Sequence, residues 1–462
     1  MTDSVRSPDR RSITAALLLA IDGVPAALLQ SLVASGSLRQ VARLARMGVL
    51  ADWQAATPAD ERGSHWLSAI TGHAMPTPAG HAAPHTLLAR DLPVSPLWDW
   101  ADAVGRPCRV LGWPGAIGSP EQAVPGLPTG AVRVAEPRHW PTVNAQGLPL
   151  ASDRPEPSAL CWPGSQRALL QRERVLPDDL PPATLRRLQP WRPLPGRDGE
   201  AAEFALERAA RRLAAHWLSV LAIGGAWCAR PDNALNLLRF DGLAAYAATL
   251  RRWVPATEVQ PLLQPWLLWL DELLGTLIEE LQGAQLDRCH EGRGHGDTVV
   301  AVLAETSPRP AALSHGLLLL CAPGVPAGLR LNQPVALADI APTLACRLAL
   351  PRPPALQGRD LMTQVAATQG RTMGDDQDLD DGDDGDDTAD DDRGLMGQEG
   401  RNASHPPPSA RPGPRPAGWP AASRPEVRLA RQGSDTTQPP RSSWLQRLQR
   451  LLVPGALDRG LS

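Results

Sequence analysis

The stretch Ala15-Ala16-Leu17-Leu18-Leu19-Ala20-Ile21-Asp22-Gly23 decides the fold that the sequence predicts. A short, uninterrupted apolar run that ends in Asp-Gly is typical of a strand buried on both faces, which stops at the carboxyl edge of a sheet. Ligands of open α/β sheets bind outside the carboxyl ends of the strands, so Asp22 lies where a site is expected. Its carboxylate is either a metal ligand or a helix-capping or turn aspartate, and this segment alone leaves both open.

Strand-like and helix-like segments alternate from residue 12 to about residue 365. Beyond the first strand, the apolar patterns predict strands at 109–112, 234–240, 298–303 and 317–321, and helices at 25–47, 96–104, 201–222, 244–253 and 262–282. Alternation of this kind is typical of a mostly parallel sheet with helices on both faces. We therefore predict an α/β fold, a three-layer sandwich over residues 12–365, preceded by a polar arm at 1–11.

The composition changes abruptly after this sandwich. Residues 374–392 are rich in Asp and Gly, and residues 401–441 are rich in Pro, Ser and Arg. Such segments cannot bury enough apolar surface to fold, so we expect a disordered linker over 366–441.

The chain then ends in a predicted amphipathic helix at 442–454, with Pro454 at its end. Its apolar stripe consists of Trp444, Leu445, Leu448, Leu451 and Leu452. A stripe of this kind on a long tether suits docking to a protein partner or to an anionic membrane surface. Packing back onto the chain's own core is the other interpretation.

The net charge and the cysteine pattern bear on the partners and the location that we expect for this protein. The net charge is -3 and no basic stripe accompanies the tryptophans, so nucleic acid is not an expected partner. The six cysteines are scattered with no C-x-x-C pair, which indicates reduced thiols and a cytoplasmic location. The apolar run that follows Arg10-Arg11 is interrupted by Asp22, so we expect neither a signal peptide nor a membrane span.

Seven groups of short segments occur in an order that identifies a family resemblance. They are Leu-Leu-Leu-Ala-Ile-Asp-Gly at 17–23, Trp-Leu-Ser-Ala-Ile-Thr-Gly at 66–72, 96–98 with 110–114, 161–163 with 172–178, Arg-Phe-Asp-Gly-Leu at 239–243, 316–324, and 338–343 with 356–360. Together they resemble the alkaline-phosphatase superfamily, specifically bacterial type I phosphodiesterase/nucleotide pyrophosphatase-like proteins. The resemblance covers about residues 14–362 and implies an alkaline-phosphatase-like sandwich.

The resemblance also implies a site in which Asp and His residues hold two metal ions, usually zinc, and a Ser or Thr attacks phosphorus. Asp22 matches the first metal-binding aspartate. The position of the nucleophile is taken by Arg62, which cannot attack phosphorus. A ligand aspartate and a ligand histidine are replaced by Ala244 and Ala248.

Three further positions are changed near the carboxyl end of the sandwich. The family's Ser-Asp-His-Gly segment becomes Ala304-Glu305-Thr306-Ser307, so Glu305 keeps a carboxylate while Thr306 replaces an imidazole. Ala312 stands where the last histidine is expected, and His315 is displaced by three residues.

A metal site reduced to Asp22 and Glu305 is not expected to hold zinc. We therefore predict a pseudoenzyme without a metal cofactor that acts in binding, scaffolding or regulation, in which Arg62 and His65 bind an anion without turnover. The alternative is a metal-dependent phosphodiesterase or nucleotide pyrophosphatase-type hydrolase. It would use zinc or manganese at an altered site with Asp22, Glu305 and the displaced His315.

The densest group of possible metal ligands elsewhere is Cys289, His290, Glu291 and His295. A thiolate, two imidazoles and a carboxylate suit a transition metal. Their spacing matches no known metal motif, so a polar surface loop is the competing interpretation.

Overall fold

The computed structural model describes residues 13–58, 65–74, 92, 94–116, 131–134, 161–162, 172–189, 199–230, 232, 234–290, 297–306 and 313–375. Its strands are β1 (Ile13–Val24), β2 (Val49–Pro58), β3 (Cys108–Leu111), β4 (Ala131–Val134), β5 (Cys161–Trp162), β6 (Leu235–Phe240), β7 (Asp297–Thr306), β8 (Leu313–Cys321), β9 (Leu329–Arg330) and β10 (Val335–Ala336). Its α-helices are α1 (Ala26–Ala34), α2 (Arg39–Met47), α3 (Trp66–Thr71), α4 (Leu97–Ala103), α6 (Pro182–Leu188), α7 (Gly199–Cys228), α8 (Leu243–Trp253), α9 (Ala256–His290), α10 (Ile340–Arg347) and α11 (Leu361–Asp375).

One mixed sheet runs through the described part of the chain, in the strand order β10-β2-β8-β7-β1-β6-β3-β4-β5, with β9 beside β2. The central strands β7, β1, β6 and β3 are parallel neighbours. The strand β8 is antiparallel to both β2 and β7, and β5 is antiparallel to β4. The expected mostly parallel sheet is therefore confirmed, and β1 lies at its centre.

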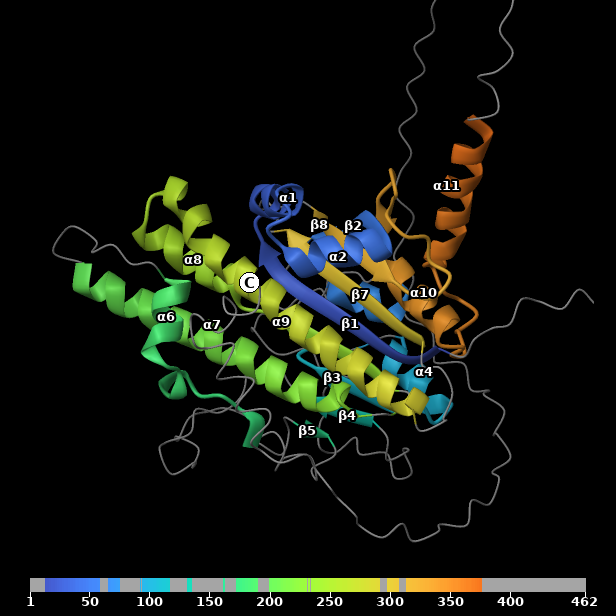
Figure 1. The fold of residues 1–462 in the computed structure, drawn as a ribbon, viewed down its shortest axis with the longest axis horizontal. Helices are drawn as coiled ribbons and strands as arrows, with labels where there is room; N and C mark the ends of the chain where they lie inside the picture. The colour runs from blue at the N-terminus through green and yellow to red at the C-terminus, as the bar shows by residue number, and fades with distance from the viewer. Residues whose placement is uncertain are drawn as a thin grey trace, which may run out of the picture.

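Helices cover both faces of the sheet, so the expected sandwich is also confirmed. Leu17, Leu19 and Ile21 of β1 pack with α1, α2, α7, α8 and α9 on one face. Leu18 and Ala20 pack on the other face, in a core with α3, α4 and α10. Figure 1 shows the long helices α7 and α9 running beside each other along the sheet. The alternating apolar side chains of β1 thus contribute to both cores, which is why the strand carries no charged residue before Asp22.

The segment 25–47 is two helices and not the single helix that we predicted. Gly36, at a φ of +68°, ends the first helix, a backbone conformation that glycine adopts without strain. The second helix starts afresh because Asp271 of α9 caps it: the amide groups of Gln40 and Val41 each donate to this carboxylate at 2.9 Å. A carboxylate at a helix N-terminus satisfies amide groups that have no partner within the helix.

The strand β2 is absent from the strands that we predicted from the sequence. Buried and exposed residues alternate along this strand: Ala51, Trp53 and Ala55 are buried, whereas Asp52 and Gln54 are exposed. This alternation with a period of two is typical of a half-buried strand. The few β-branched residues in the segment concealed the pattern.

The boundary predicted at residue 365 lies inside a helix. The last described helix, α11, begins at Leu361 and continues to Asp375, with Leu361 and Val365 buried against the core. This helix replaces the first part of the predicted disordered linker. The polar arm at 1–11, the remainder of the linker and the predicted helix at 442–454, with its stripe from Trp444 to Leu452, lie outside the described residues. Among the helices that are described, none has the length and apolar character needed to cross a bilayer.

Candidate functional site

The carboxyl end of β1 meets the start of α8 at very close range. Gly23 has a φ of +72°, and a Cβ atom there would lie 2.5 Å from the Cβ of Ala244 and 2.6 Å from its backbone nitrogen. Glycine is therefore required both for the backbone conformation and for the contact. Ala244 is the position where the family resemblance implies a metal-binding aspartate.

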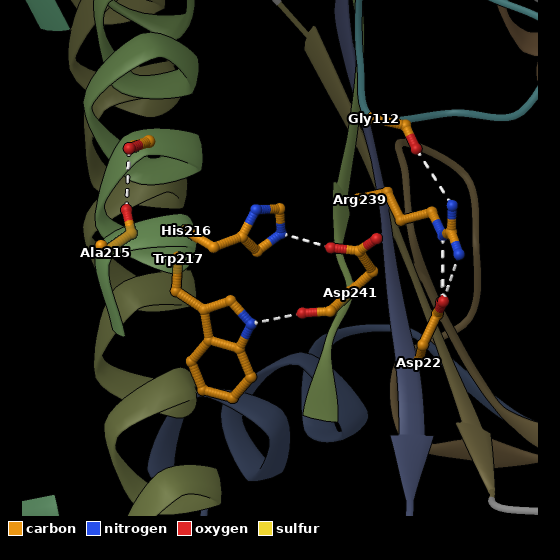
Figure 2. Close-up of polar contacts among 8 residues, drawn as sticks. Asp22, Gly112, Ala215, His216, Trp217, Arg239 and Asp241 are labelled. Atoms are coloured by element: carbon orange, nitrogen blue, oxygen red, sulfur yellow. Dashed lines mark hydrogen bonds and ion pairs between the residues drawn. The ribbon is translucent and has the colours of Figure 1, made fainter. Parts of the chain in front are cut away.

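The side chain of Asp22 is bound by Arg239 of β6. The two strands are parallel, and Ala20 of β1 lies opposite Arg239, so Asp22 and Arg239 emerge on the same face of the sheet. The Nε atom of Arg239 lies 3.2 Å from Oδ1 and 3.1 Å from Oδ2 of Asp22, and its Nη2 atom also pairs with Oδ2. Its Nη1 atom donates to the carbonyl of Gly112 at 3.1 Å (Figure 2). The guanidinium thus contacts both oxygens of Asp22.

Burial and neighbouring charges act on the same carboxylate in opposite directions. Burial raises the pKa of Asp22 above its ordinary value, the charge and hydrogen bonds of Arg239 lower it, and the charges of Glu305 and Asp241 raise it. Arg239 is therefore the group that stabilises the ionised form of Asp22.

Glu305, near the end of β7, lies beside a buried imidazole. The Nε2 atom of His65 is 3.2 Å from Oε1 of Glu305, without the alignment of a hydrogen bond, and both side chains are buried. The ring of His65 also lies against that of Trp66, with centroids 5.1 Å apart. His65 is thus part of the packed interior and faces a carboxylate, which does not fit the predicted role of binding an anion from solution.

A third pair lies at the end of β6. The Nε2 atom of His216 on α7 is 2.5 Å from Oδ1 of Asp241, and the indole of Trp217 donates to the carbonyl of Asp241 at 3.0 Å (Figure 2). The carboxyl edge therefore gathers three carboxylates, from Asp22, Asp241 and Glu305, which we call the edge cluster. The charges of the last two act on the first.

Other predicted site positions do not join the edge cluster. The hydroxyl of Thr306 donates to the carbonyl of His315 at 2.9 Å, across the β7–β8 pair. The side chain of His315 is exposed, with Nδ1 3.2 Å from the carbonyl of Leu313. The altered site with a displaced His315 is thus not formed in this structure. Arg62 and Ala312 lie outside the described residues.

No group of three or more His, Cys, Asp or Glu side chains in the described ranges is arranged to hold a metal ion. Ala244 and Ala248 both lie on α8 and supply no ligand. Of the second candidate metal group, Cys289 and His290 belong to the last turn of α9, while Glu291 and His295 lie beyond the described residues.

Three of the segments that carry the family resemblance meet on the α3 and α10 side of the sheet. The amide groups of Gln357 and Gly358 donate to the carbonyl of Gly72 at 3.1 Å and 2.9 Å. The carboxylate of Asp339 accepts from the amide of Arg359 at 2.7 Å. A Cβ atom on Gly358 would lie 2.0 Å from the carbonyl oxygen of Ala338. These motif residues hold the fold together and are not part of the edge cluster.

The sequence contains a signal for the Asp22–Arg239 pair that the motif comparison overlooks. The strand Leu235-Asn-Leu-Leu-Arg-Phe240 is buried along its whole length and yet carries one arginine. A buried arginine needs a carboxylate or carbonyl partner, and Asp22 ends a neighbouring strand.

No protein-family model and no curated protein sequence matches the chain. The chain is similar in architecture to several solved structures. A 2-O GAG sulfatase has 10% identity and a TM-score of 0.44, and the match covers 77% of this chain and 74% of that one. The phosphonate monoester hydrolase of Agrobacterium radiobacter has 16% identity, a TM-score of 0.40 and 77% coverage of both chains. A protein in the alkaline phosphatase superfamily from Vibrio parahaemolyticus has 12% identity and a TM-score of 0.37, over 76% of this chain and 70% of that one. At these levels of likeness, the neighbours decide nothing about the activity of this chain.

Proposed function

We propose that this chain is a catalytically inactive protein with an alkaline-phosphatase-like fold, of the type I phosphodiesterase/nucleotide pyrophosphatase-like kind, and that it acts in binding, scaffolding or regulation. One observation carries the proposal. The guanidinium of Arg239 contacts both oxygens of Asp22, the carboxylate that the family resemblance assigns to a metal. A permanent internal cation thus takes the position of the metal's charge.

The chemistry of the remaining donors supports the same conclusion. Catalysis by two metal ions needs each ion to be coordinated while it activates a nucleophile or stabilises a leaving group. Zinc prefers imidazole and thiolate ligands, together with carboxylates, in tetrahedral geometry. Arg239 binds Asp22, the imidazole of His65 lies 3.2 Å from Glu305, and α8 carries alanines where the family resemblance implies ligands.

The alternative is a metal-dependent phosphodiesterase or pyrophosphatase-type hydrolase with an altered site. It requires zinc or manganese to displace Arg239 from Asp22. Displacement would leave a guanidinium without its carboxylate in a buried position, and an unpaired buried charge is costly. This cost favours the first proposal.

A hydrolysis assay separates the two proposals. Full-length protein is incubated with bis(p-nitrophenyl) phosphate, with and without added zinc or manganese, beside the variants Asp22→Ala and Asp52→Ala. Asp52 is the matched control, since it is an exposed aspartate that pairs with Arg330 on the surface. We expect the same background rate in all three proteins. Turnover that is lost in Asp22→Ala and kept in Asp52→Ala would establish the hydrolase.

We further propose that the partner, either a protein or an anionic membrane surface, binds the apolar stripe of Trp444, Leu445, Leu448, Leu451 and Leu452. The cysteine pattern supports a cytoplasmic setting. Sedimentation with vesicles of anionic lipid, compared with neutral vesicles, tests the membrane. Affinity purification of full-length protein and of a variant with Leu445, Leu448 and Leu452 changed to Asp tests a protein partner. A stripe that docks on neither gives equal results for both proteins.

A further inference from the structure

A cavity lies far from the edge cluster, between α2, α9 and the opposite end of the sheet. Its volume is about 260 Å³, and its walls include Thr298 and Val300 near the start of β7 and Cys321 at the end of β8. Glu305 is five residues further along β7, or about 16 Å at the rise of a strand. Val300 also belongs to the core on the α9 side of the sheet. The cavity is therefore separate from the candidate site.

The polar part of the wall carries positive charge without a matching negative charge. Arg43 on α2 faces the cavity with the amide side chains of Gln40 and Gln282. The described residues that line the cavity include no aspartate or glutamate. The contact of Arg43 is a long one, 3.4 Å from Nη2 to Oε1 of Gln282, and no described carboxylate forms an ion pair with it. An anion is the ligand that this guanidinium lacks.

Packing between α2 and α9 fixes these polar groups before any ligand binds. Asp271 anchors the first turn of α2 through the amide groups of Gln40 and Val41. Gly275 then lets the two helices approach closely, because a Cβ atom there would lie 2.8 Å from Cγ of Gln40. Gln40 is thus held against α9, one turn before Arg43 on the same face of α2. A preorganised site loses less entropy on binding than a flexible one.

The rest of the wall is apolar. Leu44, Ile278 and Val300 are buried, and Met47 is 48% exposed. Small-molecule sites in proteins are commonly lined by apolar side chains with a few polar groups that orient the ligand. The volume equals that of roughly nine water molecules in the liquid, so the ligand is small.

We propose that this cavity binds a small organic monocarboxylate with a short apolar chain. The carboxylate pairs with Arg43, whose planar guanidinium suits two parallel hydrogen bonds to its oxygens. The apolar chain lies against Leu44, Ile278 and Val300. A single cation balances one negative charge, so a monocarboxylate is favoured over a phosphate dianion. The site stands apart from the proposed loss of catalysis and does not depend on it.

Calorimetric titration of the full-length protein with hexanoate tests the proposal. Hexanol, hexylamine and inorganic phosphate serve as probes with the same chain or with another charge. We expect hexanoate to bind, and the three other compounds to bind at least about tenfold more weakly, since a hydrogen bond to a charged group contributes about 1.5–3 kcal/mol. If hexanol bound as tightly as hexanoate, the cavity would be a purely apolar site. If phosphate bound more tightly than hexanoate, the cavity would be a site for an inorganic anion. Each result would overturn the proposal, as would the absence of hexanoate binding.

Two variants on the same helix make the test specific. Arg43→Gln is expected to weaken hexanoate binding about tenfold or more, and Arg46→Gln, an exposed neighbour outside the cavity, is expected to leave it unchanged. Arg43→Lys keeps the charge and should retain part of the affinity, which separates a lost contact from a misfolded variant. Equal affinities of Arg43→Gln and Arg46→Gln would contradict the role of Arg43.

The thiol of Cys321 gives a second measure of ligand binding that is independent of calorimetry. Its thiol lies in the cavity wall and donates to the carbonyl of Leu44 at 3.1 Å, and burial raises its pKa to about 11. Alkylation at high pH, followed by peptide mass analysis, should be slower when hexanoate is present and unaffected by hexanol. Unchanged labelling of Cys321 at saturating hexanoate would place the ligand elsewhere.

Discussion

Two arginine–aspartate pairs, each with a buried arginine, lie at opposite ends of the central sheet. Arg239 binds Asp22 at the carboxyl end of β1, and Arg109 of β3 binds Asp232 at the amino end of β6. Arg109 also lies 3.2 Å from the carbonyl of Trp227 and 3.4 Å from Oδ1 of Asn236. The two arginines are similarly buried, but the side chain of Asp232 is 36% exposed and that of Asp22 only 12%.

This difference in exposure distinguishes the roles of the two pairs. The Arg109–Asp232 pair connects parts of the fold, whereas in the proposed function the arginine of the Arg239–Asp22 pair stands in place of a metal ion. The side chain of Asp232 reaches water, so Arg109 mainly ties the loop after α7 to the sheet. Asp22 has little access to water and has Glu305 and Asp241 near it, so its ionised form depends on Arg239. Ligand sites of open α/β sheets lie at the carboxyl end, where the less hydrated pair is found.

The largest expected effect comes from removing Arg239. The variant Arg239→Met leaves Asp22 buried without its cation, and losing one member of a buried pair costs about 3–5 kcal/mol. We expect a loss of that size in the free energy of unfolding, measured by urea titration. The double variant Asp22→Leu with Arg239→Met should recover much of the loss, because neither member of the pair is then left as an unpaired buried charge. A loss below about 1 kcal/mol in the single variant would show that Asp22 does not depend on Arg239.

The close contact at Gly23 gives the next largest effect. The variant Gly23→Ala forces a positive φ on a non-glycine residue and a clash with Ala244, for a combined cost of about 2–4 kcal/mol. Gly36→Ala is the matched control, since its φ is similar and nothing lies within 4 Å of the added atom. We expect it to cost about 1–2 kcal/mol. Equal losses in the two variants, compared by thermal unfolding, would remove the evidence for a close contact between Gly23 and Ala244.

Removing Arg109 tests the opposite end of the sheet and should cost less than removing Arg239. In Arg109→Met the carboxylate of Asp232 turns to water, while the carbonyl of Trp227 and the amide of Asn236 lose a donor. A buried polar group without a partner costs about 1–3 kcal/mol, and we expect about 2 kcal/mol in the same urea titration. A larger loss for Arg109→Met than for Arg239→Met would reverse the comparison between the two pairs.

The smallest effect is a pH dependence. Burial raises the pKa of Asp22 above its ordinary value of 3.8, so the folded chain keeps the proton of this carboxyl to a higher pH than the unfolded chain does. This contribution to stability is complete below pH 3.8 and is lost as the pH rises through the folded pKa, by at most about 1.4 kcal/mol per pH unit. The unfolding free energy of the wild type minus that of Asp22→Asn should therefore fall as the pH rises above about 4. A value that rises with pH would mean that Arg239 outweighs burial.

The sequence was sufficient for the central features of the fold and insufficient for the site. The apolar runs of β1, β6 and β7 identified a buried parallel sheet, because burial on both faces leaves a pattern that local reading detects. β2 was missed because small and polar residues weaken its alternation. The break at Gly36 depends on Asp271, which comes from a helix more than two hundred residues later in the chain.

Asp22 and Glu305 were found as single carboxylates, but their partners could not be assigned from local patterns. Arg239 reaches Asp22 only because β6 lies next to β1, although the two strands are far apart in the sequence. His65 was expected to bind an anion, and its burial against Trp66 and Glu305 follows from the packing of α3 on the sheet. Tertiary neighbours, and not residue types, decide the role of each of these groups.

The metal content of the purified chain tests the central claim, that Arg239 neutralises Asp22 in place of a metal ion. Zinc and manganese are measured per chain in full-length wild type, Asp22→Asn and Asp52→Asn, after equilibration with each metal and removal of the excess. The proposed replacement of the metal by Arg239 predicts far less than one ion per chain, with no dependence on Asp22. One or more ions per chain, lost in Asp22→Asn and retained in Asp52→Asn, would contradict it.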